Sequence, residues 1–175
     1  SGGYGQYLEW AGEGKALLPS VDGYENYVAH VSKFVKSEKA KEFYYNHVRN
    51  IVTRTNTVTG KPYTEDPAIF SWQIGNEPRA FARDSVTKAA FQEWMCSSAS
   101  LIKSLDPNHM VSTGSEGLYG CEVDMDLFEK IHSHKDFDYL NVHIWPLVWR
   151  WVTKDTFADS VCVANRQTEK YLTAH

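Results

Sequence analysis

The sequence lacks the features that mark several broad classes of protein. No stretch approaches the roughly 20 consecutive apolar residues that a membrane-spanning helix needs. The net charge of −4 provides no basic surface for a phosphate backbone, so we expect no nucleic-acid partner. The three cysteines, Cys96, Cys121 and Cys162, show no metal-ligand spacing and are odd in number. We interpret them as thiols of the core or of loops and expect no metal site.

Aromatic residues, by contrast, are abundant. They make up 14% of the 175 residues and include six tryptophans and ten tyrosines. Such rings form platforms for sugar faces, although they fill cores more often. The hydrophobic content of 42% and the charged content of 23% are typical of one soluble globular domain. A neutral ligand suits this mildly acidic chain.

The hydrophobic pattern predicts helices and strands that alternate along the chain. Asp84 is a suitable N-cap for the longest helix, and Val86 and Trp94 belong to the face of that helix that we expect to be buried. The predicted helices cover about 24–56 with a break near Ser37, 85–105, 123–134 and 155–175, and the predicted strands cover 68–75, 110–114 and 139–144. This alternation indicates an α/β fold with parallel strands and right-handed crossovers.

Polar residues gather at the C-terminal end of each predicted strand. Glu77 follows the first strand and Glu116 the second, while His143 and Trp145 end the third. Barrel enzymes build their active sites at the C-terminal ends of the strands. An open doubly wound sheet more often shows a Gly-rich nucleotide loop, which this sequence lacks. We therefore predict a (βα)8 TIM barrel with a site at this rim, and an open sheet is the alternative.

The segment from Trp72 to Arg79 runs from a strand directly into Asn76-Glu77-Pro78. Cleaving a glycosidic bond requires a proton donor whose pKa the surroundings can raise, and a Glu fixed at a strand end meets that need. The segment resembles the acid/base strand of glycoside hydrolase family 5 and its clan, which are (βα)8 barrels. The resemblance implies that Glu77 is the catalytic acid/base and that Asn76 offers its amide to the sugar. Taken by itself, the tripeptide is also ordinary at a turn.

A second motif, from Asn141 to Pro146, resembles the sixth strand of the same family. That strand carries a His and an aromatic residue, two positions apart, which face the reacting sugar. His143 and Trp145 occupy these positions, and Trp145 stands where many relatives have Tyr. A lone His in a strand is more often a satisfied core group, but the distance from Glu77 leaves room for one intervening strand, as the barrel order requires.

Three further segments, 7–12, 46–56 and 114–117, resemble the endo-β-mannanase branch of the family. The resemblance implies that Arg79 contacts the sugar on the leaving-group side. We expect Glu116 to orient or acidify Glu77, because two neighbouring carboxylates do not both ionise cheaply. We expect Trp149 to form a sugar platform. The plainer alternatives are a surface ion pair for Arg79, a simple loop acid for Glu116 and packing for Trp149.

The resemblance covers nearly the whole chain, as a section from just after the third barrel strand to the sixth helix. We therefore expect residues 1–175 to be a single partial catalytic domain. The nucleophile of the family is a Glu at the end of the seventh strand, beyond His175. We expect this polypeptide alone to be inactive unless another chain supplies the rest of the barrel.

The function that we expect is that of a retaining endo-β-1,4-mannanase, a hydrolase that degrades mannan, galactomannan or glucomannan without a metal or organic cofactor. Polysaccharide degradation implies an extracellular, cell-surface or periplasmic setting, with an export signal outside this segment, since Ser1 to Tyr4 lack the basic and apolar regions of such a signal. The alternatives are a β-1,4-glucanase of the same family and a non-catalytic carbohydrate-binding relative.

Overall fold

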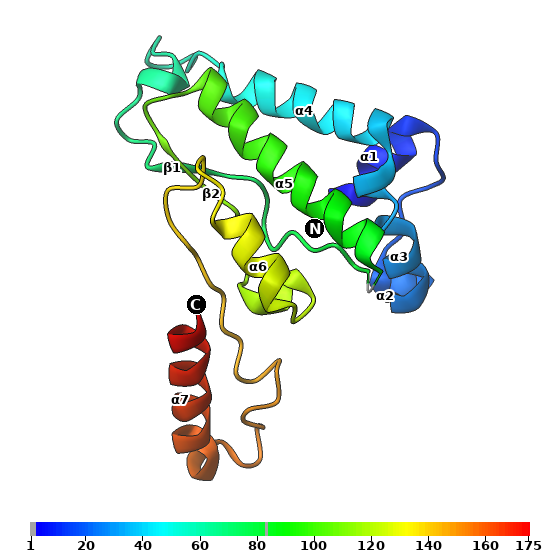
Figure 1. The fold of residues 1–175 in the computed structure, drawn as a ribbon, viewed down its shortest axis with the longest axis vertical. Helices are drawn as coiled ribbons and strands as arrows, with labels where there is room; N and C mark the ends of the chain where they lie inside the picture. Colours follow the sequence, from blue (N-terminus) through cyan, green and yellow to red (C-terminus); the bar gives the residue numbers. More distant parts are fainter. Residues whose placement is uncertain (1–2, 83) are drawn as a thin grey trace.

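The computed structural model describes residues 3–82 and 84–175. Its α-helices are α1 (Tyr4–Ala11), α2 (Pro19–Asp22), α3 (Tyr24–Val31), α4 (Glu38–Val52), α5 (Ser85–Leu105), α6 (Met125–His132) and α7 (Phe157–Ala174). Short 3-10 turns cover Phe34–Lys36, Tyr63–Glu65 and Leu118–Cys121, and the strands are β1 (Ser71–Gln73) and β2 (Met110–Ser112). In Figure 1, α4 and α5 lie side by side above the strands, while α7 lies apart at the other end of the molecule.

Local sequence explains where the main helices begin. Ser37, Asp84 and Asp124 each precede a helix, and their side chains accept a hydrogen bond from the backbone N–H three residues later. An N-cap of this kind stabilises a helix by about 1 kcal/mol. The predicted break at Ser37 and the predicted cap at Asp84 are confirmed.

The two strands are parallel neighbours. Ser71 pairs with Met110 and Gln73 with Ser112, and α5 forms the crossover between the strands. The pairing continues past β1, because the N–H of Ile74 donates to the carbonyl of Ser112 over 3.2 Å. β1 and β2 therefore end at the same edge.

The third predicted strand, over 139–144, does not form as a strand. The segment returns past β2 (Figure 1), but side chains replace much of the backbone ladder. The N–H of Asp138 donates to the Val111 carbonyl over 2.9 Å, and the carboxylate of Asp138 accepts from the Val111 N–H over 2.7 Å. Asn141 accepts from the Gly114 N–H over 3.1 Å and donates to the Ser115 carbonyl over 2.7 Å. This segment is held beside β2 without strand geometry.

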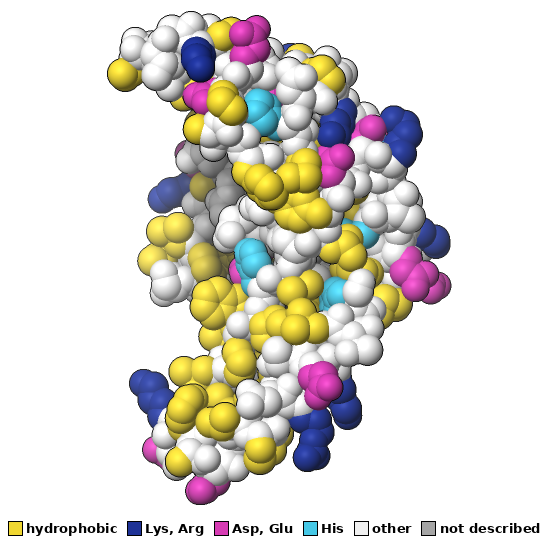
Figure 2. Space-filling view, turned by 90° about the vertical axis from the view of Figure 1, so that its left-hand side faces the viewer, with side chains coloured by type: hydrophobic (Ala, Val, Ile, Leu, Met, Phe, Trp, Pro, Cys, Tyr) yellow, Lys and Arg dark blue, Asp and Glu magenta, His cyan; other side chains and the backbone are white. Residues whose placement is uncertain are grey.

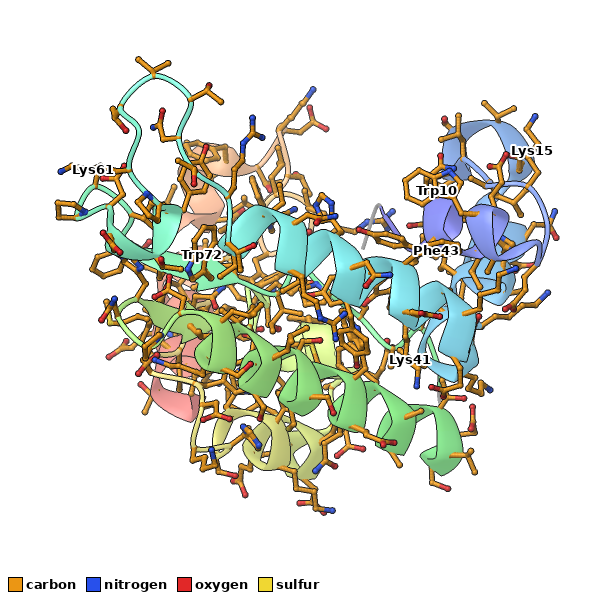
Figure 3. All side chains as sticks on the ribbon, turned by 90° about the horizontal axis from the view of Figure 1, so that it is seen from above. Trp10, Lys15, Lys41, Phe43, Lys61 and Trp72 are labelled. Carbon is orange, nitrogen blue, oxygen red and sulfur yellow. The ribbon has the colours of Figure 1, made fainter. Side chains whose placement is uncertain are left out.

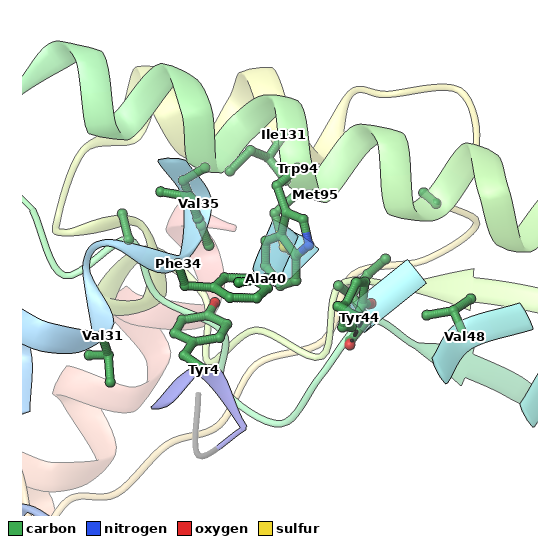
Figure 4. Close-up of a cluster of buried hydrophobic side chains, with 14 of the residues drawn as sticks. Tyr4, Val31, Phe34, Val35, Ala40, Tyr44, Val48, Trp94, Met95 and Ile131 are labelled. Atoms are coloured by element: carbon green, nitrogen blue, oxygen red, sulfur yellow. Dashed lines mark hydrogen bonds between the residues drawn. The ribbon is translucent and has the colours of Figure 1, made fainter. Parts of the chain in front are cut away.

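An aromatic core joins the helices on one side of the strands. The rings of Tyr4 and Phe34 stack with centroids 4.4 Å apart, and Trp94 packs edge-on against Phe34 at 5.2 Å (Figure 4). Trp10 of α1 also reaches Phe43 of α4, with centroids 6.4 Å apart (Figure 3). These contacts fix α1 and α4 against α5.

The buried face of α5 differs from the prediction at its first turn. Trp94 is buried as expected, but Val86 is 68% exposed. The cap by Asp84 directs Thr87 inward instead, and Thr87 is 1% exposed. The inward stripe of α5 then continues through Phe91, Trp94, Met95, Ser98, Ala99 and Ile102.

β1 is tied to the end of α5 by a buried carboxylate. Asp106 is fully buried; it accepts hydrogen bonds from Trp72 Nε1 and from His109 Nδ1, each over 2.7 Å. Burial alone would raise the pKa of Asp106, but these hydrogen bonds outweigh it and the pKa lies below its usual value. β1 is thus anchored through the side chain of its middle residue, and its C-terminal end leads to the site.

Candidate active site

Glu77 lies just beyond β1, at the rim where both strands end. Its N–H donates to the carbonyl of Gly114 over 2.9 Å, which holds it beside the residues that follow β2. Glu77 has a left-handed φ of 50°, a conformation that costs an L-residue about 1–2 kcal/mol. Gly114 lies so close to the first strand that a Cβ there would be 1.9 Å from the carbonyl oxygen of Gly75. The close approach therefore requires glycine at 114.

Two side chains from the returning segment bind the Glu77 carboxylate. His143 Nδ1 donates to Glu77 Oε1 over 2.8 Å, and Trp145 Nε1 donates to the same oxygen over 3.2 Å. The hydrogen bond from His143 is the largest influence on the pKa of Glu77 and lowers it, against the opposing effect of burial. The Glu77 side chain is still 31% exposed, so a ligand can reach it.

Arg79 and Glu116 form an ion pair next to Glu77. The Arg79 Nε and one terminal nitrogen both bind Glu116 Oε1. The Glu116 side chain is only 3% exposed, whereas that of Arg79 is 29% exposed. A buried carboxylate requires such a partner. The pKa of Glu77 is lowered, chiefly by the hydrogen bond from His143 and in the same direction by the charge of Arg79. That Glu116 orients Glu77 or keeps it protonated stays a prediction.

These side chains surround one open cavity of about 660 Å³. Its walls contain all seven residues that the sequence singled out, namely Asn76, Glu77, Arg79, Glu116, His143, Trp145 and Trp149, together with Ile144 and Val148. The predicted shared hollow of Glu77, His143 and Trp145 is thus confirmed. Val148 was not predicted, because a 71% exposed valine in an irregular segment has no pattern that marks it.

A second cavity, of about 490 Å³, adjoins Glu77 on the free side of β1. Tyr7, Tyr44 and His47 line it, and none of them was predicted as a site residue. Tyr7 and His47 do belong to segments 7–12 and 46–56, whose sequences stood out. Tyr44 donates its hydroxyl to the Ile74 carbonyl over 3.0 Å, so this side of the strand is in contact with α4.

The indole of Trp149 forms the far wall of the first cavity. It packs on Tyr119, with ring centroids 4.4 Å apart, and Trp151 packs behind it at 4.9 Å. Figure 2 shows exposed apolar side chains gathered on the part of the molecule that contains α7. The apolar residues exposed in and just before that helix include Leu147, Val148, Phe157, Val161 and Leu172.

Residues 3–82 and 84–175 contain no metal-binding cluster: no group of three or more His, Cys, Asp or Glu side chains there could hold a metal ion. No helix in the same ranges is both long and apolar enough to cross a membrane. His132, which the sequence places near a second His, instead binds the Phe128 carbonyl through Nδ1 over 2.8 Å.

Two parallel strands joined by a helical crossover, with a carboxylate, an imidazole and an indole over their C-terminal ends, are the arrangement expected in a section of a (βα)8 barrel. Comparison with known proteins identifies the family. A family model described as GH family 5 beta-mannosidase-like matches residues 1–175. The chain therefore belongs to glycoside hydrolase family 5.

Curated relatives agree with this assignment. The chain is 34% identical over 177 residues to mannan endo-1,4-beta-mannosidase 1 of Arabidopsis thaliana, covering 90% of this chain and 39% of that protein. It is 35% identical over 162 residues to mannan endo-1,4-beta-mannosidase 4 of Oryza sativa subsp. japonica, covering 86% and 32% respectively. The chain thus spans well under half the length of these relatives.

Solved structures confirm the fold as an incomplete (βα)8 barrel. A glycoside hydrolase family 5 mannosidase from Rhizomucor miehei, in complex with mannosyl-fructose, matches with a TM-score of 0.80 and 32% identity, over 99% of this chain and 40% of that one. The endo-beta-1,4-mannanase of Thermotoga petrophila matches with a TM-score of 0.68 and 25% identity, over 97% and 36% respectively.

Proposed function

We propose that the protein containing this chain is a retaining endo-β-1,4-mannanase in which Glu77 is the acid/base. The observation that supports this role is the position of the Glu77 carboxylate, fixed by His143 and Trp145 at a strand end and open to a cavity. The names of the curated relatives favour mannan as the substrate.

In the proposed first step, Glu77 donates its proton to the glycosidic oxygen as the bond from that oxygen to the anomeric carbon breaks and a nucleophilic carboxylate bonds to that carbon. In the second step, the Glu77 carboxylate takes a proton from the water that attacks the same carbon, and the bond to the nucleophile breaks. Both steps use a group that exchanges one proton, and a glutamate at a fixed site does so without a metal. His143 and Trp145 hold Glu77 Oε1, which orients the carboxyl for both transfers.

A retaining mechanism also requires a nucleophilic carboxylate at roughly 5–5.5 Å from the acid/base. We place this nucleophile outside residues 1–175, since Glu116, which shares the cavity, is held by Arg79. A second carboxylate so close to Glu77 would raise the pKa of Glu77. The nucleophile of the complete site would therefore oppose the lowering of the Glu77 pKa that is found in this chain.

The leaving-group sugar is proposed to lie in the first cavity, between Arg79 and the Trp149 indole. The guanidinium offers N–H donors to sugar hydroxyls, and the indole face packs on the C–H face of a pyranose ring. A neutral polymer fits this combination. We further propose that the protein works outside the cell or at its surface, where such polymers occur.

The test uses the full-length protein that contains this chain. We expect hydrolysis of galactomannan to exceed that of carboxymethylcellulose, and Glu77→Gln to lower kcat by about 10²- to 10⁴-fold. Preference for the cellulose derivative would replace the mannanase with a β-1,4-glucanase. Binding of mannan without hydrolysis would indicate the non-catalytic alternative.

One observation favours a second candidate, an exo-acting β-mannosidase. The matching family model is described as beta-mannosidase-like, and the Rhizomucor miehei structure with a TM-score of 0.80 is a mannosidase. The products from mannohexaose separate the two functions. Release of mannobiose and mannotriose supports the endo enzyme, whereas release of mannose alone supports the exo enzyme.

A further inference from the structure

The loop that carries Glu116 is held by Tyr171 of α7 and by His175, which directly follows that helix. The Tyr171 hydroxyl donates to the Glu116 carbonyl over 2.7 Å and accepts from the Tyr119 N–H over 3.3 Å. His175 Nε2 accepts from the Leu118 N–H over 2.7 Å. Tyr171 lies in the last turn of α7, and His175 follows four residues later, directly after the helix. Three of the four loop positions 116–119, namely 116, 118 and 119, are thereby tied to this end of α7.

Gly117 shows how closely this loop packs on the helix. A Cβ at this position would lie 2.5 Å from His175 Nε2 and 2.7 Å from the Tyr171 hydroxyl. The backbone of the loop therefore rests directly on both side chains. Glu116, which this backbone carries, in turn pairs with Arg79 in the cavity.

The Tyr171 ring also supports the opposite wall of the cavity. Tyr119 stacks on Tyr171 with centroids 5.6 Å apart and an interplanar angle of 19°. Trp149 lies 4.4 Å from Tyr119 and 5.2 Å from Tyr171. One side chain thus contacts the backbone that positions Glu116 and the indole that faces it.

Tyr171 itself does not line either cavity beside Glu77. We propose that Tyr171 is a positioning residue that sets the separation between the Arg79–Glu116 pair and the Trp149 indole, and thereby the fit of the leaving-group sugar. This inference rests on the proposed function. Burial raises the pKa of Tyr171 to about 12, so its hydroxyl stays a neutral donor over the working range of pH.

A purely structural role for Tyr171 is the competing explanation. Within α7, only Ala164 and Tyr171 are buried, so Tyr171 is the main attachment of the helix to the rest of the chain. Loss of this attachment would lower all activities together. A positioning role predicts a selective loss, confined to substrates whose leaving group occupies the cavity.

The experiment compares Tyr171→Phe with Tyr24→Phe in the full-length protein. Tyr171→Phe keeps the ring and removes only the hydroxyl, and Tyr24 is a 60% exposed tyrosine of α3 that serves as the matched control. Two substrates are used: mannopentaose, whose leaving group is a sugar, and β-mannobiosyl fluoride, whose leaving group is a single atom. Thermal unfolding of each variant is recorded as well.

We expect Tyr171→Phe to lower kcat/KM for mannopentaose about fivefold, mainly through KM, because a buried hydrogen bond is lost. Turnover of the fluoride should stay within about twofold, since that substrate does not use the leaving-group side. Tyr24→Phe should change neither. Equal losses on both substrates, or no loss on mannopentaose, would overturn the proposal.

A second measurement separates the positioning role of Tyr171 from the proposed mannanase function. If the wild-type protein hydrolyses neither substrate, the proposed function fails. The positioning role is then tested by acrylamide quenching of the Trp149 fluorescence. The Trp149 contribution is taken as the difference between each protein and its Trp149→Phe counterpart. Increased quenching in Tyr171→Phe supports the positioning role, and unchanged quenching refutes it.

Discussion

His143 Nδ1 lies 2.8 Å from Glu77 Oε1, a hydrogen bond that joins the end of β1 to a segment 66 residues further along the chain. The contact orients the carboxylate and lowers its pKa at the same time. It is also the link between the two sequence motifs that first indicated a glycosidase.

Replacing His143 by Ala is expected to raise the pKa of Glu77, because the hydrogen bond that lowers it most is removed. A general acid must be protonated, so the basic limb of the kcat/KM profile should move to higher pH while the maximum rate falls. The measurement is the pH–rate profile from pH 3 to 9. Trp145→Phe, which removes the weaker donor, should shift the limb less; a downward shift in either variant would contradict the assignment.

The same group affects stability as a function of pH. The folded pKa of Glu77 lies below the ordinary value of about 4.3, so its hydrogen bonds stabilise the fold above that pH. The contribution disappears as pH falls through the folded pKa. The difference in unfolding free energy between wild type and Glu77→Gln should therefore be smaller at pH 3 than at pH 7, as measured by urea denaturation.

Removing Arg79 should cost stability, because it leaves the Glu116 carboxylate buried without a partner. We expect Arg79→Met to lower the free energy of unfolding by about 3 kcal/mol. Glu116→Gln together with Arg79→Met should recover much of that loss, since the uncompensated charge is gone. A double-mutant cycle in urea tests this, and a coupling close to zero would show that the pair is held by other contacts.

Gly114 offers a sharp test of the close approach at the rim. Gly114→Ala should destabilise the fold by more than about 2 kcal/mol, because the new Cβ would meet the Gly75 carbonyl. Gly60→Ala is the matched control: its φ of +73° resembles the +71° of Gly114, but nothing lies within 4 Å of its Cβ. It should cost about 1 kcal/mol. Equal losses for the two would mean that backbone strain, not the contact, decides.

Asp106 tests the anchor of β1. Asp106→Ala should lower the free energy of unfolding by about 3 kcal/mol, because Trp72 Nε1 and the His109 ring lose a shared buried acceptor. Asp106→Asn should cost less, since one acceptor oxygen remains. Asp126→Ala, on the exposed side of α6, is the control. Thermal or urea unfolding supplies the measurement.

Local sequence determined the main helices and the rim of the site, but α1 and α2 were not predicted. The caps at Ser37 and Asp84 act on N–H groups three residues away, so short-range chemistry suffices to place the starts of α4 and α5. Side chains alternate along a strand, and parallel strands end at one edge. These two rules predict that Glu77, His143 and Trp145 lie together, and the three side chains do meet, although the segment of His143 and Trp145 forms no regular strand.

Tertiary structure decided what depends on partners distant in sequence. The Asp138 side chain accepts the hydrogen bond from the Val111 N–H, and the segment that follows Asp138 forms no regular third strand. Glu116 pairs with Arg79, and its loop is bound by Tyr171, 55 residues away. Such contacts follow from the three-dimensional path of loops, which no short-range pattern encodes. The sequence therefore determined which groups meet at the rim, and the tertiary structure decided how they are paired.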